Sequence, residues 1–240
     1  MTQPYPFDLR EPDLPTFGLI VLRADETIEQ EFRRHFPPDA ARLHVTRVHS
    51  GDTLSPGSIA AMEARLSAAA ALLPPAANFD AVGYACTSGT ALIGAARVHA
   101  MIAEGVTAPA FTDPLTAAIA RMRDLKLRRV GILSPYVPSV AAPLCSAFTA
   151  AGFDVPETLS FGEEVEARVA RIDPRSIAQA ARALAGRGPL DGLFLSCTNL
   201  QTIDITADLE RELGLPVVAS NQAMAWHMRQ LAVSHRKPAS

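Results

Sequence analysis

Two cysteines lie in matching contexts that could give a thiol a chemical role. Each follows a short apolar segment typical of a buried strand and precedes a helix-like segment, in Cys86-Thr-Ser-Gly89 and in Cys197-Thr-Asn199. Backbone N–H groups and the positive end of a helix dipole lower the pKa of a thiol placed there. A single buried cysteine is more often a core residue than a catalyst, but two at matching positions favour catalysis. We therefore predict that Cys86 and Cys197 act as acid, base or nucleophile.

Polar side chains beside the two cysteines could hold the oxygens of a small acid. Thr87 and Ser88 follow the first cysteine, and Thr198 and Asn199 follow the second. Hydroxyls, an amide and exposed N–H groups are donors suited to a carboxylate or enolate oxygen. These four residues are therefore predicted to bind substrate.

Two further residues are candidates, each with a plainer alternative. Asp25 follows the first predicted strand, where its carboxylate could bind a substrate cation or only cap the helix expected over 26–36. Tyr136 could donate its hydroxyl to an oxyanion, or pack beside two neighbouring prolines. Cys145 has no comparable context and is expected in the core.

The chain is predicted to contain an internal duplication that positions these residues. Phe17-Gly-Leu-Ile-Val21 resembles Val130-Gly-Ile-Leu-Ser134. The first cysteine follows Gly18 by 68 residues, and the second follows Gly131 by 66. Ligands of open parallel sheets bind beyond the carboxyl ends of the strands. A pseudo-twofold relation between two such halves would therefore bring the two thiols face to face across a cleft that holds the active site.

The segments between these motifs predict an α/β fold. Short apolar runs alternate with segments of helical period, which is typical of βα units and parallel sheets. The strand candidates are residues 17–22, 43–48, 81–84, 110–112, 130–133, 158–161, 192–195 and 217–219. One helix is expected over 59–73 and the last over 221–231. The predicted halves are residues 1–115, completed by the C-terminal helix 220–240, and residues 116–219.

The composition bounds the class of protein and its partners. The chain has 240 residues, of which 48% are hydrophobic and 20% charged, and a formal net charge of -3. Such a chain can bury a large core, and 22 basic against 25 acidic residues leave no basic surface for nucleic acid. The N-terminus does not resemble a secretory leader, and no apolar segment approaches the roughly 20 residues that cross a bilayer. No membrane partner and a cytoplasmic location are therefore expected.

Signals for metals and cofactors are missing from the sequence. The six histidines have no metal-ligand spacing and the three cysteines form no CxxC pair, so reduced thiols and no metal are expected. The GxGxxG, GxxxxGK(S/T) and GxSxG motifs are absent, and no cofactor is predicted. A cysteine hydrolase would need a histidine beside its nucleophile, and His99 is poorly placed for that role.

Two strand-end cysteines in duplicated halves resemble the aspartate/glutamate racemase superfamily. The resemblance runs from about Gly18 to Leu231 and is closest to the branch of maleate cis-trans isomerase and arylmalonate decarboxylase. It implies that Cys86 is the nucleophile or base of the first half and Cys197 the opposing proton donor. It also implies oxygen-binding roles for Thr87, Ser88, Tyr136 and the region of Thr198, and a homodimer or higher homo-oligomer. The motifs that carry it are Cys86-Thr-Ser-Gly89, Ser134-Pro-Tyr136, Leu195-Ser-Cys-Thr-Asn-Leu200 and Ser220-Asn-Gln-Ala-Met-Ala-Trp226.

Two residues of this chain differ from those of the enzymes that it resembles, and they narrow the choice of reaction. Arylmalonate decarboxylases have glycine in place of the first cysteine, so Cys86 argues against that reaction. Maleate isomerases carry asparagine where this chain has Asp25, and an anionic side chain there would repel a dicarboxylate. Segment 18–29 looks most like the ectoine-utilisation protein EutA.

The leading hypothesis is a cofactor-independent racemase, epimerase or isomerase that acts on a small carboxylate, such as an amino-acid derivative of the ectoine pathway. One thiol would remove a proton from one face of a carbon, and the other would return a proton to the opposite face. Maleate cis-trans isomerisation is the alternative, in which a cysteine adds to the alkene before the C–C bond rotates. An arylmalonate decarboxylase-like enzyme and a non-catalytic protein that binds a small acid are the further alternatives.

Overall fold

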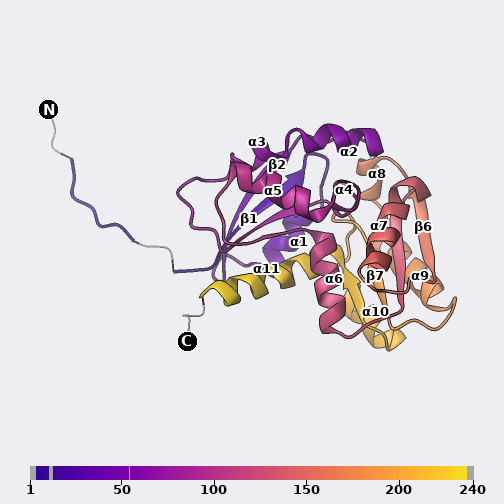
Figure 1. Cartoon of the computed structure of the whole chain (residues 1–240). Helices are drawn as coiled ribbons and strands as arrows, with labels where there is room; N and C mark the ends of the chain where they lie inside the picture. Colours follow the sequence, from indigo (N-terminus) through magenta and orange to yellow (C-terminus); the bar gives the residue numbers. More distant parts are fainter. Residues whose placement is uncertain (1–3, 11–12, 54, 237–240) are drawn as a thin grey trace.

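Two parallel sheets of equal strand order form the centre of the molecule. The computed structural model describes residues 4–10, 13–53 and 55–236. The sheet orders are β2-β1-β3-β4 and β6-β5-β7-β8, and Figure 1 shows them in two neighbouring lobes. This arrangement confirms the predicted α/β fold of two similar halves. The strands are β1 (Thr16–Leu22), β2 (Arg42–Val48), β3 (Ala81–Ala85), β4 (Phe111–Thr112), β5 (Val130–Tyr136), β6 (Thr158–Glu163), β7 (Gly192–Leu195) and β8 (Val217–Ala219).

The central strands are buried on both faces, as parallel strands between helical layers usually are. All residues of β1, β3, β5 and β7 are buried. Side chains alternate between two hydrophobic clusters, so that Ile20 belongs to one and Leu19 to the other. A Cβ on Gly18 would lie 2.9 Å from Leu73 Cδ1, and one on Gly131 would lie 2.7 Å from Leu190 Cδ1. The repeated glycine therefore lets a neighbouring leucine pack directly on the central strand of each half.

The structure differs from the predicted segments in several places, among them the helix expected over 59–73, the start of the first helix, the end of β5 and the last helix, which runs to Arg236 rather than 231. The helices are α1 (Ile28–His35), α2 (Pro56–Glu63), α3 (Leu66–Ala70), α4 (Thr87–Ile93), α5 (Ala95–Gly105), α6 (Pro114–Asp124), α7 (Pro138–Ala150), α8 (Glu166–Val169), α9 (Pro174–Ala185), α10 (Thr206–Leu213) and α11 (Ser220–Arg236). The single helix expected over 59–73 is two, because the N–H of Arg65 bonds to the carbonyl oxygen of Met62 and tightens the chain between α2 and α3. Helix α1 starts at Ile28 rather than 26, because Asp25 accepts the N–H groups of Thr27 and Ile28. Strand β5 continues to Tyr136 after an irregular register with β6.

Helix α11 leaves the second sheet and packs on the first half. It follows β8 directly and contacts α1, α6 and β3. A Cβ on Gly83 of β3 would lie 2.2 Å from Met224 Cε and 3.4 Å from Met228 Sδ, so the glycine admits these two side chains. Figure 1 shows α11 running from the second lobe beneath the first. The division into residues 1–115 with 220–240 and residues 116–219 stays a prediction, and 237–240 lie outside the described residues.

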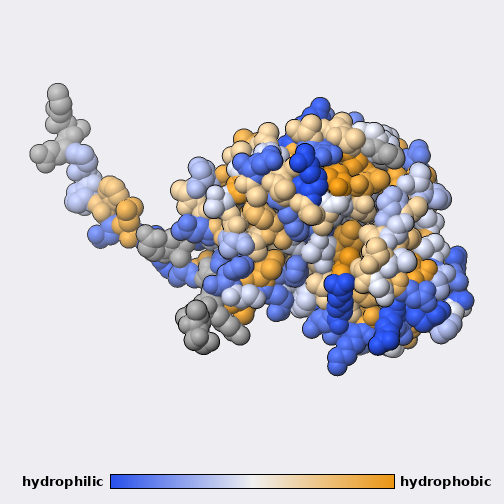
Figure 2. Space-filling model, in the orientation of Figure 1, coloured by the Kyte–Doolittle hydropathy of each residue, from blue (hydrophilic) through white to orange (hydrophobic). Residues whose placement is uncertain are grey.

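The surface shows how the two lobes differ in polarity. Figure 2 shows hydrophilic residues over α9 and α10, and hydrophobic residues gathered over α4, near the line where the lobes meet. Within the described ranges, no helix combines the length and the apolar character needed to span a bilayer.

Candidate active site

Cys86 directly follows strand β3 and is the N-cap residue of helix α4. It is 3% exposed, and its Sγ accepts the backbone N–H of Gly89 at 3.2 Å. A Cβ on Gly89 would lie 2.8 Å from that sulfur and 2.7 Å from the Tyr84 hydroxyl. Glycine is therefore needed where the two groups meet the first turn of the helix.

Cys197 is held differently, although it follows the equivalent strand β7. It is 5% exposed, and its φ of 137° lies in a region that side-chain-bearing residues rarely adopt. Its N–H donates to Ser220 Oγ at 3.0 Å, and its Sγ accepts the N–H of Asn199 at 3.3 Å. The next helix, α10, begins only at Thr206. The predicted help from a helix dipole is therefore absent at this cysteine.

Contacts between their neighbours bring the two cysteines together. Thr198, which follows one cysteine, donates its hydroxyl to the carbonyl oxygen of Ala85, which precedes the other, at 3.3 Å. Thr87 Oγ1 lies 3.0 Å from Ser220 Oγ, the same hydroxyl that accepts the N–H of Cys197. Both sulfurs therefore lie at the junction of the halves, as the duplication predicts.

Burial raises the pKa of both thiols. The pKa of Cys86 rises to about 12, because burial outweighs the bonds from Gly89 and Tyr84 that favour the thiolate. The pKa of Cys197 lies well above the ordinary thiol value, first through burial and next through the negative charge of Glu166. The expectation of lowered thiol pKa values was wrong. Desolvation exceeds the stabilising effect of the N–H donors, so the ligand-free protein holds two protonated thiols at neutral pH.

Tyr136 lies in the site, and it brings a buried carboxylate with it. Its hydroxyl lies 3.0 Å from Cys197 Sγ and donates to Glu166 Oε1 at 2.8 Å. Glu166 begins α8 and is 2% exposed. Burial raises the pKa of this carboxyl, and the bonds from Tyr136 and Asn199 oppose that rise. Asn199 Nδ2 donates to Glu166 Oε2 at 3.0 Å.

Asp25, Thr198 and Asn199 use their polar atoms to join the halves. Asp25 Oδ1 accepts the N–H groups of Thr27 and Ile28, each at 2.9 Å, and its Oδ2 accepts the Thr198 hydroxyl at 2.8 Å. Asn199 Oδ1 accepts the backbone N–H of the residue after Asp25 at 2.9 Å. The Asp25 carboxylate therefore both caps α1, as the plainer alternative has it, and lies beside the thiols, where its charge raises the pKa of both.

Ser88 and Thr87 differ in how free their hydroxyls are. Among the described residues, the Ser88 hydroxyl has no hydrogen-bond partner, and the side chain is 4% exposed. Thr87 is bound to Ser220. Ser88 is therefore the predicted binding residue whose donor is available to a ligand.

The chain matches a family of known enzymes. Residues 40–240 match the model described as arylmalonate decarboxylase. This chain belongs to the arylmalonate decarboxylase family. It is 30% identical over 234 residues to the arylmalonate decarboxylase of Bordetella bronchiseptica, which covers 93% of each chain. It is 27% identical over 221 residues to a maleate isomerase of Nocardia farcinica, which covers 87% of this chain and 86% of that protein.

Solved structures share the fold. The maleate isomerase Iso of Pseudomonas putida S16 superposes with a TM-score of 0.82 at 19% identity, covering 91% of this chain and 92% of that one. The Nocardia farcinica maleate cis-trans isomerase, as a cysteine-to-serine variant with a covalently bound succinylcysteine intermediate, gives the same TM-score and coverage at 23% identity. The family is thus one of enzymes, with a decarboxylase and isomerases among these relatives.

Sequence reasoning missed Glu166 of this family member. Glu166 lies near two other acidic residues, Glu163 and Glu164, so the run reads as an ordinary solvated segment. Only the hydrogen bond from Tyr136, at the end of β5, to Glu166, at the start of α8, shows that this glutamate turns inward. No spacing relative to either cysteine could have found it.

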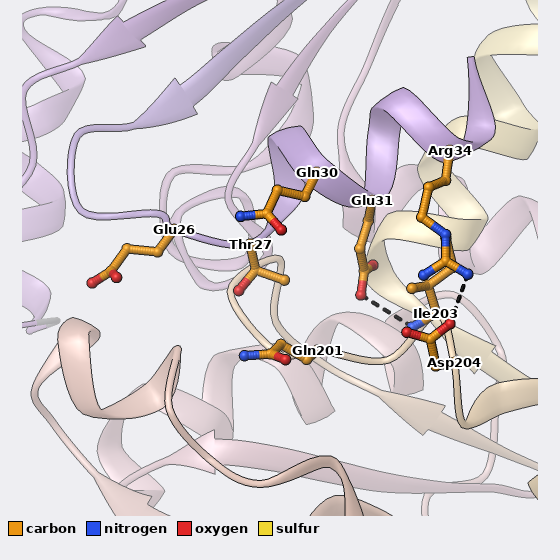
Figure 3. Close-up of a pocket in the computed structure, with 8 residues that line it drawn as sticks. All are labelled: Glu26, Thr27, Gln30, Glu31, Arg34, Gln201, Ile203 and Asp204. Carbon is orange, nitrogen blue, oxygen red and sulfur yellow. Dashed lines mark hydrogen bonds and ion pairs between the residues drawn. The ribbon is translucent and has the colours of Figure 1, made fainter. Parts of the chain in front are cut away.

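Three cavities of the structure lie away from the thiols. The pocket in Figure 3 has a volume of about 160 Å³ and lies between α1 and the loop before α10. Cavities of about 470 and 430 Å³ are lined by residues of the first half. None of the three is lined by Cys86 or Cys197. In the described part of the chain, no group of three His, Cys, Asp or Glu residues could hold a metal ion.

Proposed function

We propose that this protein is a cofactor-independent isomerase that uses Cys86 and Cys197 on a small carboxylate substrate. The observation that carries the proposal is the pair of buried thiols at the ends of equivalent strands, whose neighbouring residues contact each other. A protein that only binds an acid has no use for two opposed thiols. A homo-oligomer and a cytoplasmic location stay predictions.

Cis-trans isomerisation of an unsaturated acid such as maleate is the form of this chemistry that the relatives favour. In this scheme, the Cys86 thiol first releases its proton to water, and its sulfur then forms a bond to one alkene carbon while the π electron pair moves to the other. Cys197 gives its proton to that second carbon, and the new single bond rotates. Cys197 then takes a proton back as the S–C bond breaks, which releases the trans acid.

The surroundings of the two sulfurs support this assignment of roles. Cys86 must attack as a thiolate, and the bonds from Gly89 and Tyr84 stabilise its charged form. Cys197 must carry a proton, and the charge of Glu166 disfavours its thiolate. Ser88 offers its hydroxyl to a substrate oxygen. The charges of Glu166 and Asp25 disfavour the thiolate at both sulfurs, and the difference lies in rank: after burial, the largest influence on the pKa is the Gly89 N–H at Cys86 and the Glu166 charge at Cys197.

Inversion at a carbon next to a carboxylate is the second candidate, and two buried carboxylates favour it. Asp25 and Glu166 both act on the thiols with negative charge. A dicarboxylate would meet repulsion there, whereas a substrate with one carboxylate and a cationic group would not. This form includes the EutA-like role on an ectoine-derived amino acid, which stays a prediction.

Proton NMR in deuterated water separates these reactions in one assay. Fumarate formed from maleate supports cis-trans isomerisation. Deuterium entering the α-position of an amino acid or ectoine derivative supports inversion. Arylacetate formed from an arylmalonate would overturn both forms, and turnover of none of these substrates would contradict an enzyme of this class.

Replacement of each thiol by serine tests the two-cysteine site. We expect Cys86→Ser and Cys197→Ser each to lower kcat by at least ~10²-fold, because a serine hydroxyl is too weak an acid for either role. Cys145→Ser is the matched control and should leave kcat unchanged, because Cys145 lies on α7 with its sulfur outside the site. Near-normal kcat in either of the first two variants would exclude the mechanism.

A further inference from the structure

A closed ring of hydrogen bonds surrounds the sulfur of Cys197. Tyr136 links that sulfur at 3.0 Å to Glu166 Oε1 at 2.8 Å. Asn199 links Glu166 Oε2 at 3.0 Å back to the sulfur through its own N–H at 3.3 Å. All four side chains are buried. Each oxygen of Glu166 thus contacts a residue that also contacts the thiol.

Counting protons in this ring fixes the direction of its bonds. A tyrosine hydroxyl has one proton, and an ionised carboxylate can only accept. When Glu166 is ionised, Tyr136 donates to it, so the bond to Cys197 must be donated by the thiol. When Glu166 is protonated, it donates to Tyr136, and Tyr136 is then free to donate to a Cys197 thiolate.

We propose that Cys197 and Glu166 share one proton through the hydroxyl of Tyr136, so that Glu166 is the positioning residue that decides the protonation of Cys197. In the transfer, the S–H bond breaks as the Tyr136 oxygen gains that proton, and the Tyr136 O–H bond breaks as Glu166 Oε1 gains the other. The negative charge moves from carboxylate to sulfur, and no further reactant is needed. This inference rests on the proposed function, because it explains how Cys197 serves as acid in one step and base in another.

Other ionisable groups near the Cys197 thiol favour proton sharing between Cys197 and Glu166. Asp25 acts on this thiol from the loop before α1, and Tyr136 and Glu166 act on it from β5 and α8, while Cys86 at the start of α4 acts on Tyr136. Burial raises the pKa of Glu166 from its ordinary value, and the charge of Asp25 adds to this rise. A carboxyl that is reluctant to ionise is better able to take a proton from a thiol. Among the residues that the structure describes, no carboxylate is bonded to Cys86 through a hydroxyl in this way.

The amide of Glu166→Gln gives a sharp test. Asn199 Nδ2 is a donor, so the glutamine oxygen must turn toward it and the NH2 group toward Tyr136. Tyr136 then accepts from the amide and directs its own proton to Cys197. The variant both removes the negative charge and adds a donor to the sulfur, so the Cys197 thiolate should become more stable.

The experiment follows the ultraviolet absorbance of the thiolate against pH in the full-length Cys86→Ser/Cys145→Ser protein, in which Cys197 is the remaining thiol. We expect Glu166→Gln to raise the ratio of thiolate to thiol at least ~10-fold at a given pH, equal to one pKa unit. Glu164→Gln, an exposed neutralisation two residues away, is the matched control and should leave the titration unchanged. An unchanged titration in Glu166→Gln would overturn the proposal.

Tyr136→Phe distinguishes the shared proton from a charge acting through space. With the hydroxyl removed, Glu166→Gln should shift the titration of Cys197 by much less than it does when Tyr136 is present. An equal shift in both backgrounds would overturn the shared proton. Because this titration needs no substrate, it can succeed when no isomerase activity is found, and it can fail when activity is present.

Discussion

The two site cysteines differ from Cys145 in solvent access and in how far burial raises the pKa of the thiol. Cys86 and Cys197 are 3% and 5% exposed, whereas Cys145 is half-buried on α7. The thiolate is the species that alkylating reagents attack, and burial raises the pKa of all three thiols. Cys86 and Cys197 should therefore become reactive only when a substrate binds beside them and changes their surroundings.

Alkylation of the ligand-free protein should reverse the order that the sequence alone indicates. We expect iodoacetamide at pH 8 to label Cys145 before Cys86 or Cys197, because only Cys145 combines partial exposure with a less strongly raised pKa. Peptide mass spectrometry over time measures the three rates. Faster labelling of either site cysteine would mean that the junction opens readily without ligand.

The sequence was sufficient for the location of the site but not for its electrostatics. Strand ends and a repeated motif predict where Cys86, Cys197 and Tyr136 lie, because chain direction fixes which ends of parallel strands meet. The pKa values depend on how deeply the junction is buried and on Glu166. Both result from packing between segments far apart in the chain, which no local pattern reports.

Two helix ends reach the same left-handed backbone conformation with different residue types. Helix α10 ends at Gly214 with a φ of 65°, in the left-handed conformation that glycine adopts without strain. After α6, the exposed Lys126 has nearly the same φ, 59°. The left-handed conformation is therefore adopted by a favourable residue after α10 and by an unfavourable one after α6.

Exchanging the residue types should move stability in opposite directions. Lys126→Gly should stabilise the protein by about 1 kcal/mol, and Gly214→Ala should destabilise it by about the same amount, because the left-handed region costs a side-chain-bearing residue about 1 to 2 kcal/mol. No atom lies within 4 Å of a Cβ on Gly214, so steric clash does not contribute. Urea unfolding midpoints measure both, and shifts of the same sign would contradict this account.

His35 makes the contact between α1 and α11 sensitive to pH. Its Nε2 is buried and has no hydrogen-bond partner among the described residues, while Arg229 of α11 donates to its carbonyl oxygen at 3.0 Å. Burial, with Arg229 and Arg34 nearby, lowers the pKa of His35 to about 4. Between about pH 6.5 and pH 4, His35 therefore binds a proton in the unfolded chain but stays neutral in the folded protein.

Acidification should accordingly lower the free energy of unfolding more in the parent protein than in a variant with a neutral residue in place of His35. As the pH falls from about 7 to about 4, His35→Gln should lose up to about 3 kcal/mol less of its free energy of unfolding than the parent does. His235→Gln, at an exposed histidine near the end of α11, is the control. Parallel pH profiles for the parent and His35→Gln would exclude the effect.

At the scale of the whole molecule, buried polar groups fasten one half to the other. Glu31 of α1 is 4% exposed, and its Oε1 accepts the N–H groups of Thr202 and Ile203 at 2.8 and 3.0 Å. Its Oε2 accepts Asn221 Nδ2 at 2.9 Å. Figure 3 shows this carboxylate reaching from α1 to the loop of the second half. One side chain of the first half thus satisfies three donors of the second half and α11.

Removal of that carboxylate should weaken the whole fold. We expect Glu31→Ala to lower the free energy of unfolding by about 3 kcal/mol, because buried donors left without acceptors cost about 1 to 3 kcal/mol each and relaxation recovers part of that. Gln30→Ala, at an exposed neighbour that lines the same pocket, is the control. Equal unfolding midpoints for these two variants would show that the Glu31 contacts carry no net stability.

Helix α11 limits how the two lobes can move. Its first residue, Ser220, contacts both Thr87 and the backbone of Cys197, while Met224 and Met228 fill the space above Gly83. A hinge that swung the lobes apart would pull these methionines out of the first half and break the contact that aligns the thiols. We therefore expect a ligand to reach the sulfurs through local displacement of loops rather than through separation of the two lobes. For the same reason, a backbone cut in the turn between α6 and β5 should leave two fragments that stay associated through the packing of α11 on the first fragment. Neither fragment would contain both Cys86 and Cys197.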